Sequence, residues 1–194
     1  MNSNNYEFEI LMKRNDELKK VLSSEKLKSE MRKIKEISDK IILAYKNNKK
    51  LLFMGNGGSM GQAKHLAGEL VGKFLKERKA LNAISFDNEV IITAVANDYS
   101  YDSVFERFVD AYANKGDVVI GLTTSGNSKN IIKAFDLAKE KGAFTFSLTG
   151  RDGGKIVNHS DISIVIPSNS TPRIQEIHLL IGHTLCEIIE QRLF

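Results

Sequence analysis

Beginning at Lys50, short apolar runs alternate with longer helical segments, and this alternation limits the chain to the α/β class of folds. Each run is long enough for one strand and ends in a turn rich in Gly or Ser; the runs occupy residues 51–54, 81–86, 118–122, 144–148 and 162–166. The segments between them have the length of the crossover helices that parallel strands require. The sequence therefore predicts an α/β fold with a doubly wound, five-stranded parallel sheet covered by helices on both faces.

The first 49 residues follow a different pattern. Residues 7–49 contain no Gly or Pro, and apolar side chains recur at helical spacings of three and four at Leu27, Met31, Ile34, Ile37, Ile41 and Ala44. Two helices fit this stretch, with a break near Ser23 and Ser24, where a serine can cap the second helix. We expect a helical arm over residues 1–49, outside an α/β core over residues 50–194 of a single domain 1–194, that packs against another subunit.

Composition and charge narrow the classes of protein that this chain can represent. With 42% hydrophobic residues the chain can build a packed core, and no apolar stretch is long enough to span a membrane. The polar start lacks the features of a signal peptide, so we expect a cytoplasmic protein without a membrane partner. Residues 1–50 hold 13 basic and 8 acidic residues, against 15 and 16 in the rest, and the two signs are interleaved as on a solvated helix. We therefore expect no nucleic-acid partner. The single Cys186 lies among apolar residues and predicts a core side chain.

Four turns follow the expected strands, at the sheet edge where α/β proteins bind ligands. They read GNGGS (55–59), TTSGNS (123–128), TGRDGG (149–154) and PSNST (167–171). GNGGS is not a dinucleotide fingerprint, because Met60 stands where the third glycine belongs, and no Gly-Lys-Ser or Gly-Lys-Thr of a P-loop occurs. TTSGNS offers Thr123, Thr124, Ser125 and Ser128 before a helix, an arrangement that suits a phosphate monoester; the alternative is a serine that only caps the helix.

Two helical pairs could hold a metal ion. His65 and Glu69 are four residues apart, and Gln175 and His183 are eight residues apart, so each pair shares one helix face. Imidazole nitrogens with carboxylate and amide oxygens suit a borderline ion such as zinc, whereas the alternative for each pair is an ordinary surface contact. His159, in a polar turn, and His178, on another helix face, are expected to take no part.

A resemblance to a known family covers the chain from about residue 50 onward. The segments that carry it are GNGGS, HLAGELVGKF, AVANDYSYDSVF, GDVVIGLTTSGNSKNIIKAFDLAKEKG, LTGRDGGKI and TPRIQEIHLLIGHTLCEIIE. They resemble the phosphoheptose isomerases of the sugar isomerase (SIS) domain superfamily. The resemblance implies a flavodoxin-like SIS fold and a homotetramer whose N-terminal helices form the central bundle. It also implies an activity, the conversion of D-sedoheptulose 7-phosphate to D-glycero-D-manno-heptose 7-phosphate, which opens heptose synthesis for bacterial lipopolysaccharide, capsule or S-layer glycans.

Site residues follow from the same resemblance, position by position. It implies one Zn²⁺ per subunit, held by His65, Glu69, Gln175 and His183. Substrate positions fall on Asn56, Gly57, Gly58, Glu69, Asn97, Asp98, Thr123, Thr124, Ser125, Ser128 and Gln175. The chain departs from the family pattern at Gln62, where an acidic residue is usual, and at Lys73, where an arginine is usual, which leaves the exact sugar open.

Moving a proton between C1 and C2 of a sugar through an enediol needs a base at carbon and an acid/base at oxygen. Glu69 can be the carbon base and His183 the oxygen acid/base. A tightly ligating residue cannot also be a free base, so either the ligation is labile or one residue serves a single role. Two alternatives remain: a non-catalytic SIS adaptor that binds a replication initiator protein, and another SIS sugar-phosphate enzyme such as an arabinose 5-phosphate isomerase or a muramic acid 6-phosphate etherase.

Overall fold

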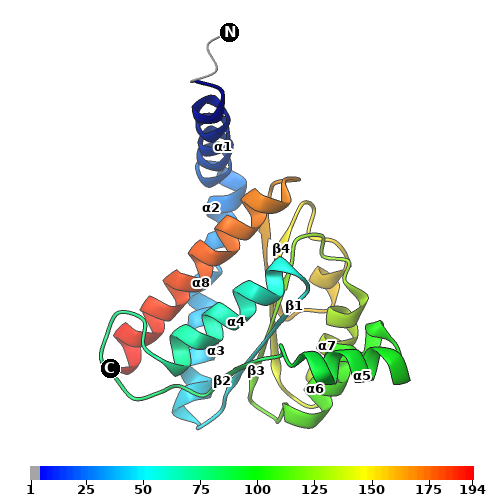
Figure 1. Ribbon diagram of the computed structural model, residues 1–194. Helices are drawn as coiled ribbons and strands as arrows, with labels where there is room; N and C mark the ends of the chain where they lie inside the picture. The colour runs from blue at the N-terminus through cyan, green and yellow to red at the C-terminus, as the bar shows by residue number, and fades with distance from the viewer. Residues whose placement is uncertain (1–4) are drawn as a thin grey trace.

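The fold is a five-stranded parallel sheet between two layers of helices (Figure 1). A computed structural model describes residues 5–194; the first four residues of the polar N-terminal stretch lie outside the described part. The strands are β1 (Leu51–Gly55), β2 (Ala83–Ser85), β3 (Val118–Thr123), β4 (Phe144–Gly150) and β5 (Ile162–Ile166), in the order β2-β1-β3-β4-β5. Every neighbouring pair is parallel, which confirms the predicted fold class.

The helices divide between the two faces of the sheet. They are α1 (Tyr6–Leu22), α2 (Glu25–Met31), α3 (Ile34–Lys46), α4 (Gly58–Val71), α5 (Glu89–Asp98), α6 (Val104–Tyr112), α7 (Lys129–Glu140) and α8 (Thr171–Leu193), with short 3₁₀ turns η2 (Tyr101–Ser103) and η3 (Lys155–Asn158). α3, α4 and α8 cover one face, and α5, α6 and α7 lie on the other (Figure 1). No helix among residues 5–194 combines the length and apolar character that crossing a membrane requires.

Alternating side chains of the central strands build a separate core on each face. In β1, Leu51 and Phe53 pack with α3, α4 and α8, whereas Leu52 and Met54 pack with α6 and α7. All five residues of β1 are buried, as are all six of β3. This two-sided burial explains why the strands read as continuous apolar runs rather than as alternating ones.

The N-terminal region differs from the expectation in two ways. The predicted break is confirmed, because Ser24 caps α2 by accepting a hydrogen bond from the amide of Leu27. A second break at residues 32–33 separates α2 from α3, so the region holds three helices rather than two. Moreover, Leu27 of α2 and Ile37 of α3 are fully buried in the core. Of these three described helices, α1 has no buried residue and projects from the body (Figure 1), so the arm is shorter than predicted.

The second break is explained by the edge of the sheet. Glu30 accepts a hydrogen bond from the amide of Val165 at 2.9 Å, and Lys33 Nζ donates to the carbonyl of Ser163 at 2.9 Å. Glu30 and Lys33 also form an ion pair at 2.8 Å. The two side chains thus bind one amide and one carbonyl on the open side of edge strand β5.

The strand order fixes where a ligand can bind. β1 and β3 are neighbours, but the chain leaves β1 through α4 on one face and leaves β3 through α7 on the other. The carboxyl ends of these two strands are the usual ligand site of such sheets. The turns 55–59 and 123–128 meet there.

Acid is expected to destabilise the protein through His178 of α8. This side chain is fully buried, and its Nδ1 has no hydrogen-bond partner among the described residues. Burial lowers the pKa of His178 from 6.5 to about 4, although a hydrogen bond to the carbonyl of Thr149 acts in the opposite direction. The unfolded chain therefore binds more protons between these two values, and stability is lost as the pH falls from 6.5 toward 4, by about 3 kcal/mol at most.

Urea unfolding at pH 7, 6 and 5 in the presence of a chelator measures this loss. His178→Gln should flatten the pH dependence, while His159→Gln, whose ring is partly exposed and contacts Asp136, should retain it. If the free energy of unfolding had the same pH dependence in the wild type and in His178→Gln, the loss of stability in acid could not be assigned to His178.

Candidate active site

The turn after β1 brings backbone close to α8. Gly57 adopts a positive φ of 53° at the start of α4, a conformation that L side chains rarely take. A Cβ on Gly58 would lie 2.7 Å from Nε2 of Gln175, so glycine permits the close approach of α4 and α8 at this point. The turn is therefore shaped by contact with α8 as well as by the strand that precedes it.

The side chain of Asn56 has a fixed orientation. The amide of Ile131 donates to Oδ1 of Asn130, which makes that atom the acceptor. Asn130 Oδ1 therefore accepts from Asn56 Nδ2 at 3.0 Å, and Asn130 Nδ2 donates to Asn56 Oδ1 at 2.9 Å. Tyr101 of η2 donates to the same Asn56 oxygen at 2.8 Å. This pairing leaves one N–H of Asn56 for a ligand.

Two of the four hydroxyls in the turn after β3 are engaged with each other. The oxygens of Thr123 and Ser128 lie 3.0 Å apart, and Thr123 Oγ1 also accepts from the amide of Gly126 at 3.2 Å. Ser128 precedes α7 but makes no side-chain capping hydrogen bond, so the cap-only alternative does not describe it. Thr123 is buried, and its hydroxyl supports the turn from below.

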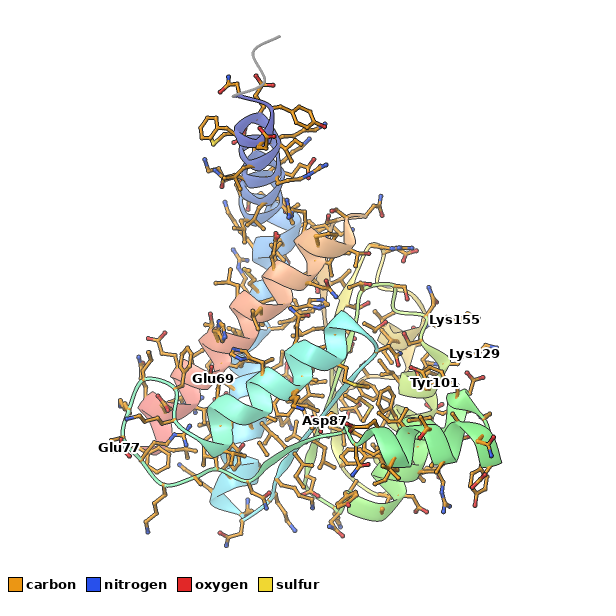
Figure 2. The ribbon with its side chains drawn as sticks, viewed as in Figure 1. Glu69, Glu77, Asp87, Tyr101, Lys129 and Lys155 are labelled. Carbon is orange, nitrogen blue, oxygen red and sulfur yellow. The ribbon has the colours of Figure 1, made fainter. Side chains whose placement is uncertain are left out.

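The other two hydroxyls, of Thr124 and Ser125, are half-buried and lie nearer the surface. Ser125 Oγ accepts a hydrogen bond from the amide of Asn127 at 3.2 Å. Gly126 has a positive φ of 67° and sits against the backbone of Gly153, in the turn after β4. The turns after β3 and β4 are thus packed together as one unit. Figure 2 shows Tyr101, Lys129 and Lys155 on this side of the molecule.

His65, Glu69 and His183 converge between α4 and α8. Nε2 of His65 lies 2.8 Å from Nε2 of His183 and 3.2 Å from Oε1 of Glu69, and the three potential ligand atoms are all within 4.8 Å of one another. The imidazole rings meet edge to face at 75°. Glu69 lies between the two helices, as Figure 2 shows. Two helices that are far apart in sequence thus contribute side chains to one cluster.

The remaining candidates occupy other positions. Gln175 lies two turns before His183, about 12 Å along α8, with its amide beside Gly58. The backbone carbonyl of Gln175 accepts a hydrogen bond from Nε2 of Gln62 at 2.6 Å. Asn97 and Asp98 are exposed at the end of α5 and hydrogen-bond each other at 2.9 Å.

Cys186 is buried among apolar side chains of the core, near the cluster. Burial, followed by the negative charges of Glu69 and Glu190, raises the pKa of the thiol to about 12. The predicted core role of this residue is confirmed.

Sequence reasoning missed a buried ion pair beside the cluster. Arg78 lies between α4 and β2, Glu190 lies on α8, and their side chains are 0% and 1% exposed, respectively. Desolvation acts to raise the pKa of Glu190, but hydrogen bonds from the amides of Phe74, Leu75 and Lys76 and from Arg78 outweigh it, so the pKa is lowered. One signal for the pair was present in the sequence. The carboxylate of Glu190 stands seven residues after His183, on the same, otherwise apolar, helix face.

Comparisons with known proteins agree with this architecture. The family model described as "SIS domain" matches residues 15–150. A phosphoheptose isomerase of Sulfurimonas denitrificans is 47% identical over 163 residues, which is 84% of this chain and 84% of that protein. One from Clostridium acetobutylicum is 49% identical over 162 residues, covering 83% of each chain.

A solved structure of a phosphoheptose isomerase from Francisella tularensis superposes with a TM-score of 0.84 at 34% identity. The match covers 93% of this chain and 98% of that one. The family model includes the turns after β1 and β3 and the helix α4, and the superposition covers nearly the whole chain. The chain belongs to the phosphoheptose isomerases, a family of isomerases built on the SIS domain.

Proposed function

We propose that this enzyme interconverts D-sedoheptulose 7-phosphate and D-glycero-D-manno-heptose 7-phosphate through an enediol, as the entry to heptoses of bacterial lipopolysaccharide, capsule or S-layer glycans. The observation that carries the proposal is the convergence of His65 and Glu69, on the helix that starts at the GNGGS turn, with His183 of α8. Gly58 and His65 are seven residues apart on α4, about 10 Å along its axis. That span is comparable to an extended seven-carbon sugar phosphate.

The phosphate end of the substrate fits the turn after β3. Thr124 and Ser125 offer hydroxyls, and the first turn of α7 offers amides at the positive end of the helix dipole. Thr123 and Ser128 hold the turn in shape through their mutual hydrogen bond. Asn56 contributes its remaining N–H, with Gly57, Gly58, Asn97, Asp98 and Gln175 as further substrate positions.

The reacting end of the substrate lies at the cluster. Glu69, whose carboxylate is partly exposed, takes the proton from one of C1 and C2 and returns it to the other. His183 moves the proton between the two sugar oxygens, since a neutral imidazole can donate at one nitrogen and accept at the other. Nε2 of His65 lies 2.8 Å from Nε2 of His183, and this contact holds the His183 ring in place.

The donor set also fits a zinc ion. Two nitrogen ligands of tetrahedral zinc, each at about 2.0 Å, stand roughly 3.3 Å apart, and the two Nε2 atoms here are 2.8 Å apart. We propose that His65, Glu69 and His183 hold one Zn²⁺ per subunit, and that Gln175 joins them as the fourth ligand by turning from its position beside Gly58. When bound, the ion would polarise the sugar carbonyl as a Lewis acid.

We also propose that the single domain assembles as a homotetramer through its N-terminal helices. α1 has no buried residue, and it exposes a series of large apolar side chains: Tyr6, Phe8, Ile10, Leu11 and Met12. A second copy of the chain is the partner that would cover them.

Incubating the purified protein with sedoheptulose 7-phosphate and Zn²⁺ tests the proposed reaction. NMR of the sugar, or a coupled kinase assay specific for the aldose, should show formation of the heptose 7-phosphate. Absence of turnover with zinc present would contradict the proposal.

Removal of the metal is expected to abolish turnover. Elemental analysis should find about one zinc per chain, and dialysis against a chelator should remove both the metal and the activity until zinc is restored. The metal should also be lost as the pH falls, because protonated imidazoles cannot ligate. Full activity of metal-free protein in excess chelator would rule out the role of zinc.

A further inference from the structure

Arg78 ties the end of α4 to the segment that follows it. Its Nη2 donates to the carbonyl of Glu69 at 2.8 Å, and its Nη1 donates to the carbonyls of Leu70 at 2.8 Å and Gly72 at 3.0 Å. These carbonyls belong to the last turn of α4, where the helix leaves acceptors unpaired and where its dipole favours a cation. The guanidinium thus caps the helix that carries His65 and Glu69.

Glu190 ties the same segment to α8. Its carboxylate accepts from the amides of Phe74 at 2.9 Å, Leu75 at 2.8 Å and Lys76 at 2.9 Å, and from Nε of Arg78 at 2.9 Å. Figure 1 shows this connection curving past the C-terminal end of α8. The segment 72–78 therefore bridges the two helices whose side chains form the cluster.

Phe74 extends the bridge to the cluster itself. Its ring stacks on the imidazole of His183, with centroids 5.4 Å apart and planes inclined by 22°. His183 and Glu190 are two turns apart on the same face of α8, since seven residues nearly complete two helical turns. One of the three residues whose amides bind Glu190 thus also stacks its ring on His183.

We propose that Arg78, Glu190 and Phe74 are positioning residues for the cluster. Arg78 and Glu190 set the separation of α4 from α8, and Phe74 sets the orientation of the His183 imidazole, so that His65, Glu69 and His183 converge. The inference rests on the proposed function, because it assigns these residues to the same zinc-binding and proton-transfer site.

The charge pair is better explained by positioning than by stability alone. Both groups are removed from water, and the desolvation cost of such a pair often cancels its attraction, so apolar side chains of similar size would stabilise the fold as well. Only the charged pair has the directed donors and acceptors that fix three successive amides and the end of a helix. Residues that orient metal ligands and catalytic groups commonly act through such directed hydrogen bonds.

Zinc affinity measured against a competing chelator, together with kcat and KM, tests the proposal. Phe74→Leu should weaken zinc binding about tenfold and lower kcat with little change in KM, because the phosphate turn is untouched. Phe74→Tyr, which keeps the ring, should behave as the wild type. Arg78→Lys, which keeps the charge but loses the planar fork, should weaken zinc binding in the same direction as Phe74→Leu.

Glu77→Gln is the matched control. Glu77 lies in the same segment, with its side chain 84% exposed, and its ion pair with Lys73 does not reach the cluster. The zinc affinity and kcat of the Glu77→Gln variant should equal those of the wild type.

The outcomes separate this inference from the proposed function. A wild-type protein that neither binds zinc nor isomerises the sugar would overturn the proposed function. A wild type that does both, with unchanged zinc affinity and kcat in folded Phe74→Leu, would overturn the positioning role. If Arg78→Lys fails to fold, Phe74→Leu still tests the positioning role, because it removes no buried charge and is expected to fold.

Discussion

Glu69→Gln is expected to lower kcat by about 10²-fold or more, the range for loss of general acid–base catalysis. The amide keeps the shape of the side chain but cannot take a proton from carbon. His183→Gln should have an effect of similar size, because it removes the group that serves the two oxygens. Both variants are to be assayed at saturating zinc, so that weakened metal binding does not account for the loss.

Phosphate binding should survive both changes, because the turn after β3 is separate from the cluster. Phosphate binding is measured by the inhibition constant of a sugar-alcohol phosphate, which binds but cannot isomerise. His159→Gln is the control, since His159 contacts Asp136 away from the cluster. Loss of turnover in His159→Gln with full turnover in Glu69→Gln would show that the reaction occurs elsewhere.

Gly126→Ala is expected to destabilise the protein by about 3 kcal/mol. Left-handed backbone costs an alanine about 1–2 kcal/mol, and an added Cβ would overlap the backbone of Gly153, whose carbonyl carbon would be 2.6 Å away. Overpacking of this kind adds roughly 1–3 kcal/mol. The turns after β3 and β4 would have to separate, so KM for the sugar phosphate should rise as well.

Urea unfolding measures the stability change, with Gly61→Ala as the comparison. Gly61 lies in α4 with open space at its Cβ position, so alanine should stabilise the helix by up to about 1 kcal/mol. Equal stability of the two variants would contradict the packing described for Gly126.

The sequence was sufficient to predict features that depend on neighbours along the chain. Buried strands such as β1 and β3 are continuous apolar runs, and their carboxyl-end turns follow directly. The pairing of His65 with Glu69 follows from a spacing of four on a helix. The meeting of these residues with His183 was implied by family resemblance, because it depends on how α4 and α8 pack.

Features that depend on tertiary packing were not predictable in this way. Arg78 and Glu190 are 112 residues apart, and the position of Glu190 on an apolar helix face does not indicate that Arg78 is its partner. The periodicity of α3 predicts an apolar helix face, but the same face fits a partner subunit or the sheet equally well. The structure places Ile37 and Ile41 against the sheet.

The contact of α2 with the sheet edge affects how chains can associate. An open edge strand is a template on which another strand can add, in aggregation or in strand exchange. Glu30 and Lys33 bind the outward amide of Val165 and the outward carbonyl of Ser163, so this part of β5 is less available as such a template. A chain shortened to begin beyond Lys33 would lose this protection and become prone to edge-to-edge aggregation, even with every active-site residue retained.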